Sequence, residues 1–233
     1  MYHSVTFGDK NTWDDWRLIP TSRPLFNPPA LKERYVDIPG ADGLLDLSTI
    51  FVNRPIFSNR QGSLEFLVED QDTPWDIIYS RIANYLHGRH HRAILEDDPG
   101  FFYEGRFKLN QWRSNPSFST ITIDYSVGPY KKSVIGTLDD WLWDSFDFEI
   151  GIIQDFKNMV VDGTLTIELI GLIQPIVPTF TTSEAMQVTW NGRTFPLPKG
   201  FSVIHDIEVR EGVNIFTFTG NGTVSLEYRG GSL

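Results

Sequence analysis

Apolar and polar residues alternate along several short stretches of this chain, which is the pattern of strands that bury one face. Between residues 63 and 69, Leu64, Phe66 and Val68 fall on one face and acidic residues fall on the other. Residues 118–127 alternate in the same way. We therefore expect both segments to be half-buried strands of one core.

A single stretch has helical spacing instead. Thr73 is placed to cap a helix, Pro74 suits its first turn, and Gly88 follows its last turn. The apolar positions that should pack on the sheet are Trp75, Ile78, Ile82, Tyr85 and Leu86.

Turn residues separate the remaining apolar segments. The sequence DDPG at 97–100 predicts a hairpin turn between two strands. Asn191-Gly192 and Asn221-Gly222 each predict a two-residue hairpin, because both residue types tolerate positive φ.

The sequence GPYKK at 128–132 interrupts the pattern and marks the best domain boundary. We therefore expect two domains, residues 1–130 and residues 131–233. Beyond the boundary the pattern is of short strands without helical periodicity, which indicates a β-sandwich or a jelly roll.

Prolines at 20, 24, 28 and 29 favour edge strands and extended segments in the first domain. We expect residues 20–45 to form an arm that reaches a neighbouring subunit. Pro39-Gly40 and Asp42-Gly43 permit sharp turns, so these four residues are candidates for an inter-subunit contact. A plain hairpin within the domain is an equally good interpretation.

Composition and charge narrow the choice of partners. Hydrophobic residues make up 40% of the 233 residues, the formal net charge is -10, and there is no cysteine. The negative charge disfavours nucleic acid and anionic membranes, and the absence of cysteine excludes disulfides and thiolate chemistry. The amino terminus lacks a signal peptide, and no apolar stretch reaches about 18 residues. We expect a protein that is made in the cytoplasm and is not secreted, unless it leaves inside a particle.

Known catalytic motifs are missing from the sequence, including a P-loop and a nucleophile elbow. His87, His90 and His91 lie on a segment whose neighbouring side chains point apart, beside arginines that repel cations. Acidic side chains could bind calcium or act as a catalytic pair, but their spacing favours turns and solvated edges. They are Asp14, Asp15, Asp97, Asp98, Asp139, Asp140, Asp144 and Asp147. We expect no catalytic residue, no metal site and no cofactor.

Tryptophans offer an alternative function, because aromatic rings can stack on sugars. Trp141 and Trp143 share one face of a possible strand, where core packing is the better explanation. Trp190 is the candidate sugar platform under the alternative that this chain is a carbohydrate-binding module, which anchors a phage particle or an enzyme to a cell surface.

Several short segments of the chain carry a resemblance to one known family. Near the amino terminus the segment is YVDIPGADGLLDL at 35–47, followed by LHG at 86–88 and ILEDDPGFFYEGR at 94–106. In the second half the segments are PTF at 178–180, VTWNG at 188–192 and VSLEYRGGSL at 224–233. In sequence and in order, these segments resemble the distal tail proteins of long-tailed bacteriophages: LHG and the segment after it resemble the family's helix exit and next hairpin, and the last three resemble its carboxy-terminal domain.

The resemblance implies a mainly β fold, with an N-terminal split β-barrel that carries one α-helix, followed by a galectin-like β-sandwich. It also implies a structural, non-enzymatic subunit of a homohexameric ring in the tail tip of a virion. One face of the ring would meet the tail-tube protein and the other the tail-associated hub protein, and the periphery could hold receptor-binding proteins. The sugar-binding motifs of galectins are missing, so lectin activity does not follow from the resemblance.

Overall fold

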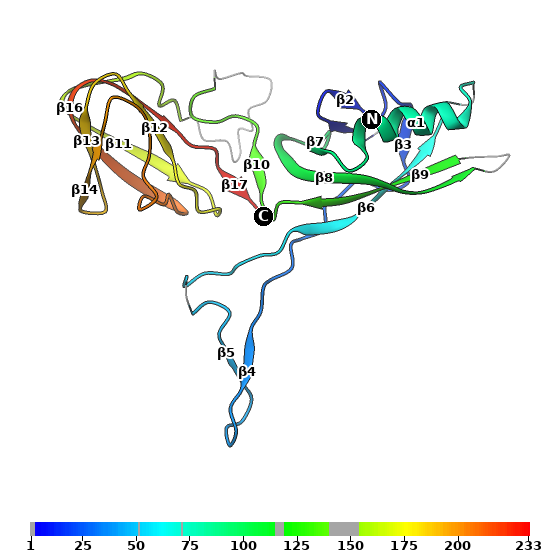
Figure 1. Ribbon diagram of the computed structural model, residues 1–233, viewed down its shortest axis with the longest axis horizontal. Helices are drawn as coiled ribbons and strands as arrows, with labels where there is room; N and C mark the ends of the chain where they lie inside the picture. The colour runs from blue at the N-terminus through cyan, green and yellow to red at the C-terminus, as the bar shows by residue number, and fades with distance from the viewer. Residues whose placement is uncertain (1–2, 51, 71, 115–118, 140–153) are drawn as a thin grey trace. The chain divides into compact units, whose positions relative to one another are not determined.

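The computed structural model describes residues 3–50, 52–70, 72–114, 119–139 and 154–233 (Figure 1). The chain divides into two compact units. Unit 1 comprises Met1–Asp98, Phe102–Lys131 and Leu233, and unit 2 comprises Pro99–Phe101 and Lys132–Ser232. Each unit has its own hydrophobic core. The fold is mainly β, with curled sheets and one helix in the described part of the chain, as the sequence predicts.

Unit 1 is built on a sheet whose neighbouring strands follow the order β2-β1-β7-β8-β9-β6-β3. The pairs are antiparallel throughout this order. The strands are β1 (Val5–Phe7), β2 (Lys10–Asn11), β3 (Leu18–Pro20), β6 (Arg60–Val68), β7 (His90–Leu95), β8 (Asp98–Ser114) and β9 (Ser119–Val127). Alternate residues of β6 and β9 are buried, which confirms the predicted half-buried strands.

Helix α1 (Trp75–Leu86) packs Ile78, Ile82 and Leu86 into the core of unit 1. Its start differs from the prediction, since Pro74 is the N-cap and no side chain caps the helix. Thr73 instead donates its backbone N–H to Asp70 Oδ1 at 3.0 Å. No helix in the described residues is long and apolar enough to cross a membrane.

The turn after β7 is tighter than the sequence predicts. Leu95 pairs directly with Asp98, so the turn consists of Glu96 and Asp97, and Pro99 already belongs to β8. Pro99 is accommodated because the register between β7 and β8 shifts between the pairs Leu95–Asp98 and Ala93–Tyr103, and proline is tolerated at such an irregularity. The short β10 (Lys131–Ser133) also pairs with β8.

Unit 2 contains a six-stranded sheet in the order β14-β13-β16-β12-β15, with β11 also paired to β16. These strands are β11 (Met159–Gly171), β12 (Thr179–Thr182), β13 (Met186–Trp190), β14 (Arg193–Leu197), β15 (Gly200–Val203) and β16 (Gly212–Glu227). The short β17 (Gly231–Ser232) pairs with β10. Asn191 and Gly192, with φ of 48° and 74°, connect β13 to β14 and confirm one predicted hairpin.

The hairpin predicted at Asn221-Gly222 is wrong, because β16 continues through it. Strand β11 pairs with β16 from Val224 back to Gly212 and holds it extended. On its other edge β16 changes partner here, from β13 to β12. A Cβ on Gly220 (φ 146°) would lie 2.7 Å from Met186 Cβ, so this glycine permits the close crossing of the strands.

Candidate interaction surfaces

A long β-hairpin of unit 1, residues 30–58, has no core of its own, and we call it the arm. Hydrogen bonds from Ser58 N to Ala30 O (2.8 Å) and from Lys32 N to Ile56 O (2.7 Å) close its base. Strands β4 (Tyr35–Asp37) and β5 (Leu44–Asp46) pair closer to its tip (Figure 1). None of its described residues is buried. The predicted arm at 20–45 therefore covered the outgoing side and the tip, but it ended within β5 and missed the rest of the returning side.

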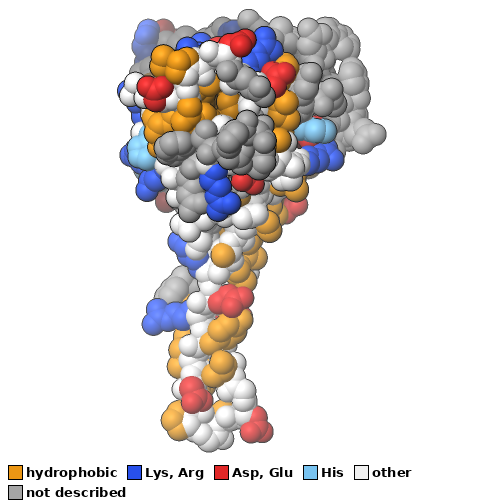
Figure 2. All heavy atoms as spheres, turned by 90° about the vertical axis from the view of Figure 1, so that its right-hand side faces the viewer, with side chains coloured by type: hydrophobic (Ala, Val, Ile, Leu, Met, Phe, Trp, Pro, Cys, Tyr) orange, Lys and Arg blue, Asp and Glu red, His pale blue; other side chains and the backbone are white. Residues whose placement is uncertain are grey.

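Apolar side chains lie exposed along the whole arm, as Figure 2 shows. Val36 and Leu45 are direct cross-strand partners, and Leu44 leaves 62% of its surface in solvent. The exposed apolar residues of the arm are Leu31, Tyr35, Val36, Ile38, Leu44, Leu45, Ile50 and Val52. A two-stranded hairpin is marginally stable alone, and so many exposed apolar side chains on one element are typical of an interaction surface.

The predicted contact residues Pro39, Gly40, Asp42 and Gly43 come together in the loop at the tip of the arm. Ala41 N donates to Ile38 O at 3.0 Å, and Gly40 has a φ of 85°, which is the geometry of a type II turn. A Cβ on Gly40 or on Gly43 would have no neighbour within 4 Å. Both glycines therefore serve backbone geometry and leave the tip open.

Charge is distributed unevenly along the arm (Figure 2). The acidic residues near the tip are Asp37, Asp42 and Asp46, and the charged residues nearer the base are Lys32, Glu33, Arg34 and Arg54. Glu33 and Asp46 raise the pKa of the exposed Tyr35, while a hydrogen bond from Ser48 lowers the pKa of Asp46. The tip is thus an anionic surface flanked by apolar side chains.

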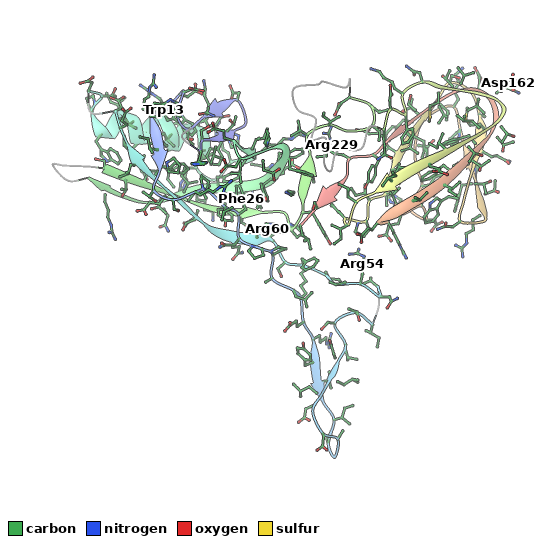
Figure 3. The ribbon with its side chains drawn as sticks, turned by 180° about the vertical axis from the view of Figure 1, so that it is seen from behind. Trp13, Phe26, Arg54, Arg60, Asp162 and Arg229 are labelled. Atoms are coloured by element: carbon green, nitrogen blue, oxygen red, sulfur yellow. The ribbon has the colours of Figure 1, made fainter. Side chains whose placement is uncertain are left out.

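A buried arginine lies at the base of the arm, where the arm joins the sheet of unit 1. Arg60 is 4% exposed and donates from Nε to Pro129 O (2.9 Å) and from Nη1 to Asn27 O (3.0 Å). Its guanidinium also lies 5.4 Å from the ring centroid of Tyr103, on which Phe26 stacks. Burial lowers the pKa of Arg60. Figure 3 labels Arg60 and Phe26 at this anchor.

The sequence analysis did not identify Arg60 as important, although a signal was present. Arg60 has the same parity as Leu64, Phe66 and Val68, so its side chain falls on the inward face of β6. An arginine at an inward strand position requires several acceptors. The carbonyl groups of Asn27 and Pro129 supply acceptors for Nη1 and Nε, whereas Nη2 is buried without a hydrogen-bond partner among the described residues.

Two of the three clustered histidines, and several of the acidic candidates, have structural partners. His91 stacks on Tyr85 and contacts its carbonyl oxygen at 3.0 Å, and His87 Nδ1 accepts a hydrogen bond from Leu109 N at 3.2 Å. Asp97 pairs with His3 and Arg23, which hold its pKa below 3.8.

Three more of the acidic candidates from the sequence are ion-paired: Asp15 with Lys10, Asp98 with Lys131, and Asp139 with Arg229. Among the described residues, no group of three or more His, Cys, Asp or Glu side chains could hold a metal ion. Asp140, Trp141, Trp143, Asp144 and Asp147 lie outside the described residues.

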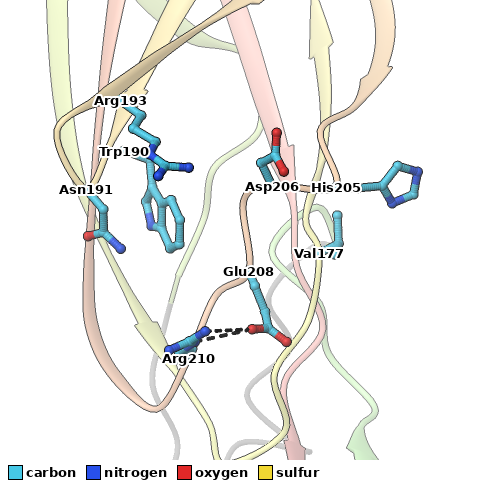
Figure 4. A pocket seen from close by; sticks show the side chains of 8 residues that line it. All are labelled: Val177, Trp190, Asn191, Arg193, His205, Asp206, Glu208 and Arg210. Atoms are coloured by element: carbon cyan, nitrogen blue, oxygen red, sulfur yellow. Dashed lines mark hydrogen bonds and ion pairs between the residues drawn. The ribbon is translucent and has the colours of Figure 1, made fainter. Parts of the chain in front are cut away.

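Trp190 lies at the end of β13 and takes part in two environments. It packs against the buried cluster of unit 2, and it also lines a pocket of about 620 Å³ (Figure 4). The other lining residues are Val177, Asn191, Arg193, His205, Asp206, Glu208 and Arg210. Trp190, the candidate sugar platform, therefore packs on the core and also lines a pocket, and its binding of sugar stays a prediction.

Comparison with known proteins shows a similarity of fold. A crystal structure of SPP1 Dit (gp 19.1), from the hub adsorption apparatus of phages that infect Gram-positive bacteria, is similar over 100% of both chains, with a TM-score of 0.57. Sequence identity to it is 12%. No protein-family model matches the chain, and no curated protein matches it in sequence. The chain therefore has a Dit-like fold.

Proposed function

We propose that this protein is a structural subunit of the tail hub of a long-tailed bacteriophage and forms a ring of six copies. The observation that carries the proposal is the fold similarity to SPP1 Dit, which extends over the full length of both chains. The resemblance of sequence segments to distal tail proteins supports the same family. In this role the protein is not an enzyme and works through its surfaces.

The arm supports ring formation. A closed head-to-tail ring requires two different, complementary patches on each subunit. The exposed apolar side chains of the arm provide one such patch, and a neighbouring copy would provide the other. In the proposed ring, Pro39, Gly40, Asp42 and Gly43 at the tip contact that neighbour. Because Arg60 holds the base, the arm loses less conformational freedom when it docks.

The two parts of the chain have separate roles in the proposal. Residues 1–130 form the ring, and residues 131–233 form a galectin-like domain that faces outward. One ring face binds the tail-tube protein, the other binds the tail-associated hub protein, and receptor-binding proteins attach at the periphery. The protein is made in the host cytoplasm and becomes part of the virion, with neither nucleic acid nor membrane as a partner.

Replacing one apolar residue of the arm tests the proposal. Leu44 exposes 62% of its surface, and complete burial of a leucine side chain is worth roughly 2 kcal/mol, so Leu44→Asp should cost more than about 1 kcal/mol per interface. Ile77 on α1 is 47% exposed and lies outside the arm, so Ile77→Asp is the matched control.

Mass photometry should detect a ring of six copies for the wild-type protein, alone or with purified tail-tube protein. We expect Leu44→Asp to abolish the ring and Ile77→Asp to leave it intact. A wild-type protein that stays monomeric in both conditions contradicts the proposal. Equal behaviour of the two variants contradicts the role of the arm.

A further inference from the structure

The pocket beside Trp190 is lined by the β13–β14 hairpin, by Val177 from the β11–β12 connection and by the connection between β15 and β16. Trp190, Asn191 and Arg193 come from the β13–β14 hairpin, while the chain between β15 and β16 contributes acidic, basic and imidazole side chains. The tight turn at Asn191-Gly192 makes Trp190 and Arg193 cross-strand partners. Figure 4 shows the Trp190 ring and the Arg193 guanidinium on one side and Asp206 on the other.

The Trp190 ring is held in position by the core of unit 2. Its cross-strand neighbour on β16 is Phe216, which is fully buried, and Trp190 itself is half-buried. A fixed aromatic ring at the side of a pocket offers a flat apolar surface without loss of side-chain entropy on binding. Such a surface matches the C–H face of a pyranose ring.

The pocket also contains a hydrogen-bond donor, Arg193, and a hydrogen-bond acceptor, Asp206, that could both bind a ligand. Glu208 and Arg210 form an ion pair at 3.1 Å. Arg193 and Asp206, by contrast, make neither an ion pair nor a side-chain hydrogen bond with any other described residue. A guanidinium donates and a carboxylate accepts two hydrogen bonds in one plane, which matches the spacing of neighbouring hydroxyl groups.

The balance of charges selects among ligand classes. The two carboxylates of the pocket, Asp206 and Glu208, balance its two guanidinium groups, Arg193 and Arg210. The lining therefore has no excess of positive charge that would favour a phosphate or a carboxylate ligand, and the net charge of -10 opposes nucleic acid. Trp190 and Val177 are the only apolar lining side chains, which is too few for a lipid or another wholly apolar molecule. A neutral, hydroxyl-rich ligand with one apolar face satisfies all of these groups.

We propose that the Trp190 pocket of unit 2 binds a neutral hexose unit of a polysaccharide. The hexose stacks on Trp190, Arg193 donates hydrogen bonds to its hydroxyl groups, and Asp206 accepts hydrogen bonds from them. The volume of about 620 Å³ lies within the usual range of small-molecule sites. This binding goes beyond the proposed ring and does not depend on it, because all lining residues belong to unit 2.

Saturation-transfer NMR on the full chain tests the proposal, with methyl glucoside, methyl galactoside and N-acetylglucosamine as probes and inorganic phosphate in a parallel titration by chemical-shift perturbation. We expect at least one hexose to bind with a Kd of about 1 mM and phosphate not to bind. Asp206→Ala should weaken hexose binding about tenfold, which corresponds to one lost hydrogen bond to a charged group.

Controls separate a lost site from a misfolded unit. Asp162→Ala removes an exposed acidic residue of β11 outside the pocket, so it should leave hexose binding unchanged (Figure 3). Trp190→Ala also removes core packing, and its circular dichroism spectrum must therefore match the wild type before its binding is compared. Phosphate binding, no binding of any hexose, or equal binding by Asp206→Ala and the wild type would each overturn the proposal.

Discussion

Replacement of Arg60 by methionine tests how the arm is anchored. The methionine side chain keeps much of the apolar stem of Arg60 and removes the guanidinium. The change therefore removes the donors to Pro129 O at 2.9 Å and Asn27 O at 3.0 Å, together with a longer hydrogen bond to Phe26 O at 3.4 Å. These acceptors lie on both sides of the arm in sequence, so the loss should loosen its base.

The free energy that Arg60→Met should cost at the base of the arm is the difference between two opposing effects. Two good hydrogen bonds from a charged donor contribute roughly 1.5–3 kcal/mol each. The cost of burying a guanidinium without a carboxylate partner offsets part of this gain. Asn27 and Pro129 are not buried, so water can partly replace the lost donor. We expect a net loss of about 2 kcal/mol, or about a 30-fold increase in local opening.

Hydrogen–deuterium exchange read out by mass spectrometry measures this opening directly. Peptides that cover residues 26–27 and 60–62 should exchange about 30-fold faster in Arg60→Met, because a free-energy loss of about 2 kcal/mol corresponds to about a 30-fold increase in local opening. Arg34→Met is the matched control, because Arg34 is an exposed arginine of the same arm. If Arg60→Met and Arg34→Met exchange at the wild-type rate, the anchoring role of Arg60 is refuted.

Three further predictions follow from local geometry. Gly220→Ala should lower the free energy of unfolding of unit 2 by about 1–3 kcal/mol, because φ is 146° and Met186 Cβ is 2.7 Å away, and an unchanged urea midpoint would contradict this. His3 and Arg23 lower the pKa of Asp97, so its stabilisation is present above pH 3.8 and is lost as pH falls through the lowered pKa of the folded state. Asp97→Asn should therefore flatten the acid limb of a urea-midpoint profile, and an identical profile would refute the assignment. Gly40→Ala should strain the turn at the tip of the arm by about 1 kcal/mol, because Gly40 has a positive φ. Hydrogen exchange at the tip should therefore become faster, while the Tm of the protein stays unchanged. Slower exchange would show that the turn does not need glycine.

The regular parts of the fold could be predicted from the sequence because local pattern and burial agree there. The alternation in 63–69 and 118–127 matched the inward faces of β6 and β9, and helical spacing identified the buried face of α1. The Asn191-Gly192 turn was predicted because both positive-φ residues are adjacent and the flanking strands are consecutive.

The failures occurred where a distant segment overrides a local preference. Asn221-Gly222 has the composition of a hairpin turn, but β11, more than 50 positions earlier in the chain, pairs along β16 and keeps it extended. The glycines there are required for a close crossing, which local sequence cannot distinguish from a turn.

The candidate sites show the same limit. The tip of the arm was identified from its turn residues, whereas the returning strand and the anchor at Arg60 depend on pairing partners that lie far away in sequence. Trp190 was identified as a possible platform, but Asp206 was not, because only the tertiary structure brings the β15–β16 connection to the same pocket. A single aromatic residue therefore indicated the site without its polar partners.

Negative-stain electron microscopy of the purified protein tests the central claim most directly. Two-dimensional class averages should show closed rings with six-fold symmetry, either for the protein alone or after addition of tail-tube protein. Class averages that contain only single, asymmetric particles under both conditions would contradict the account.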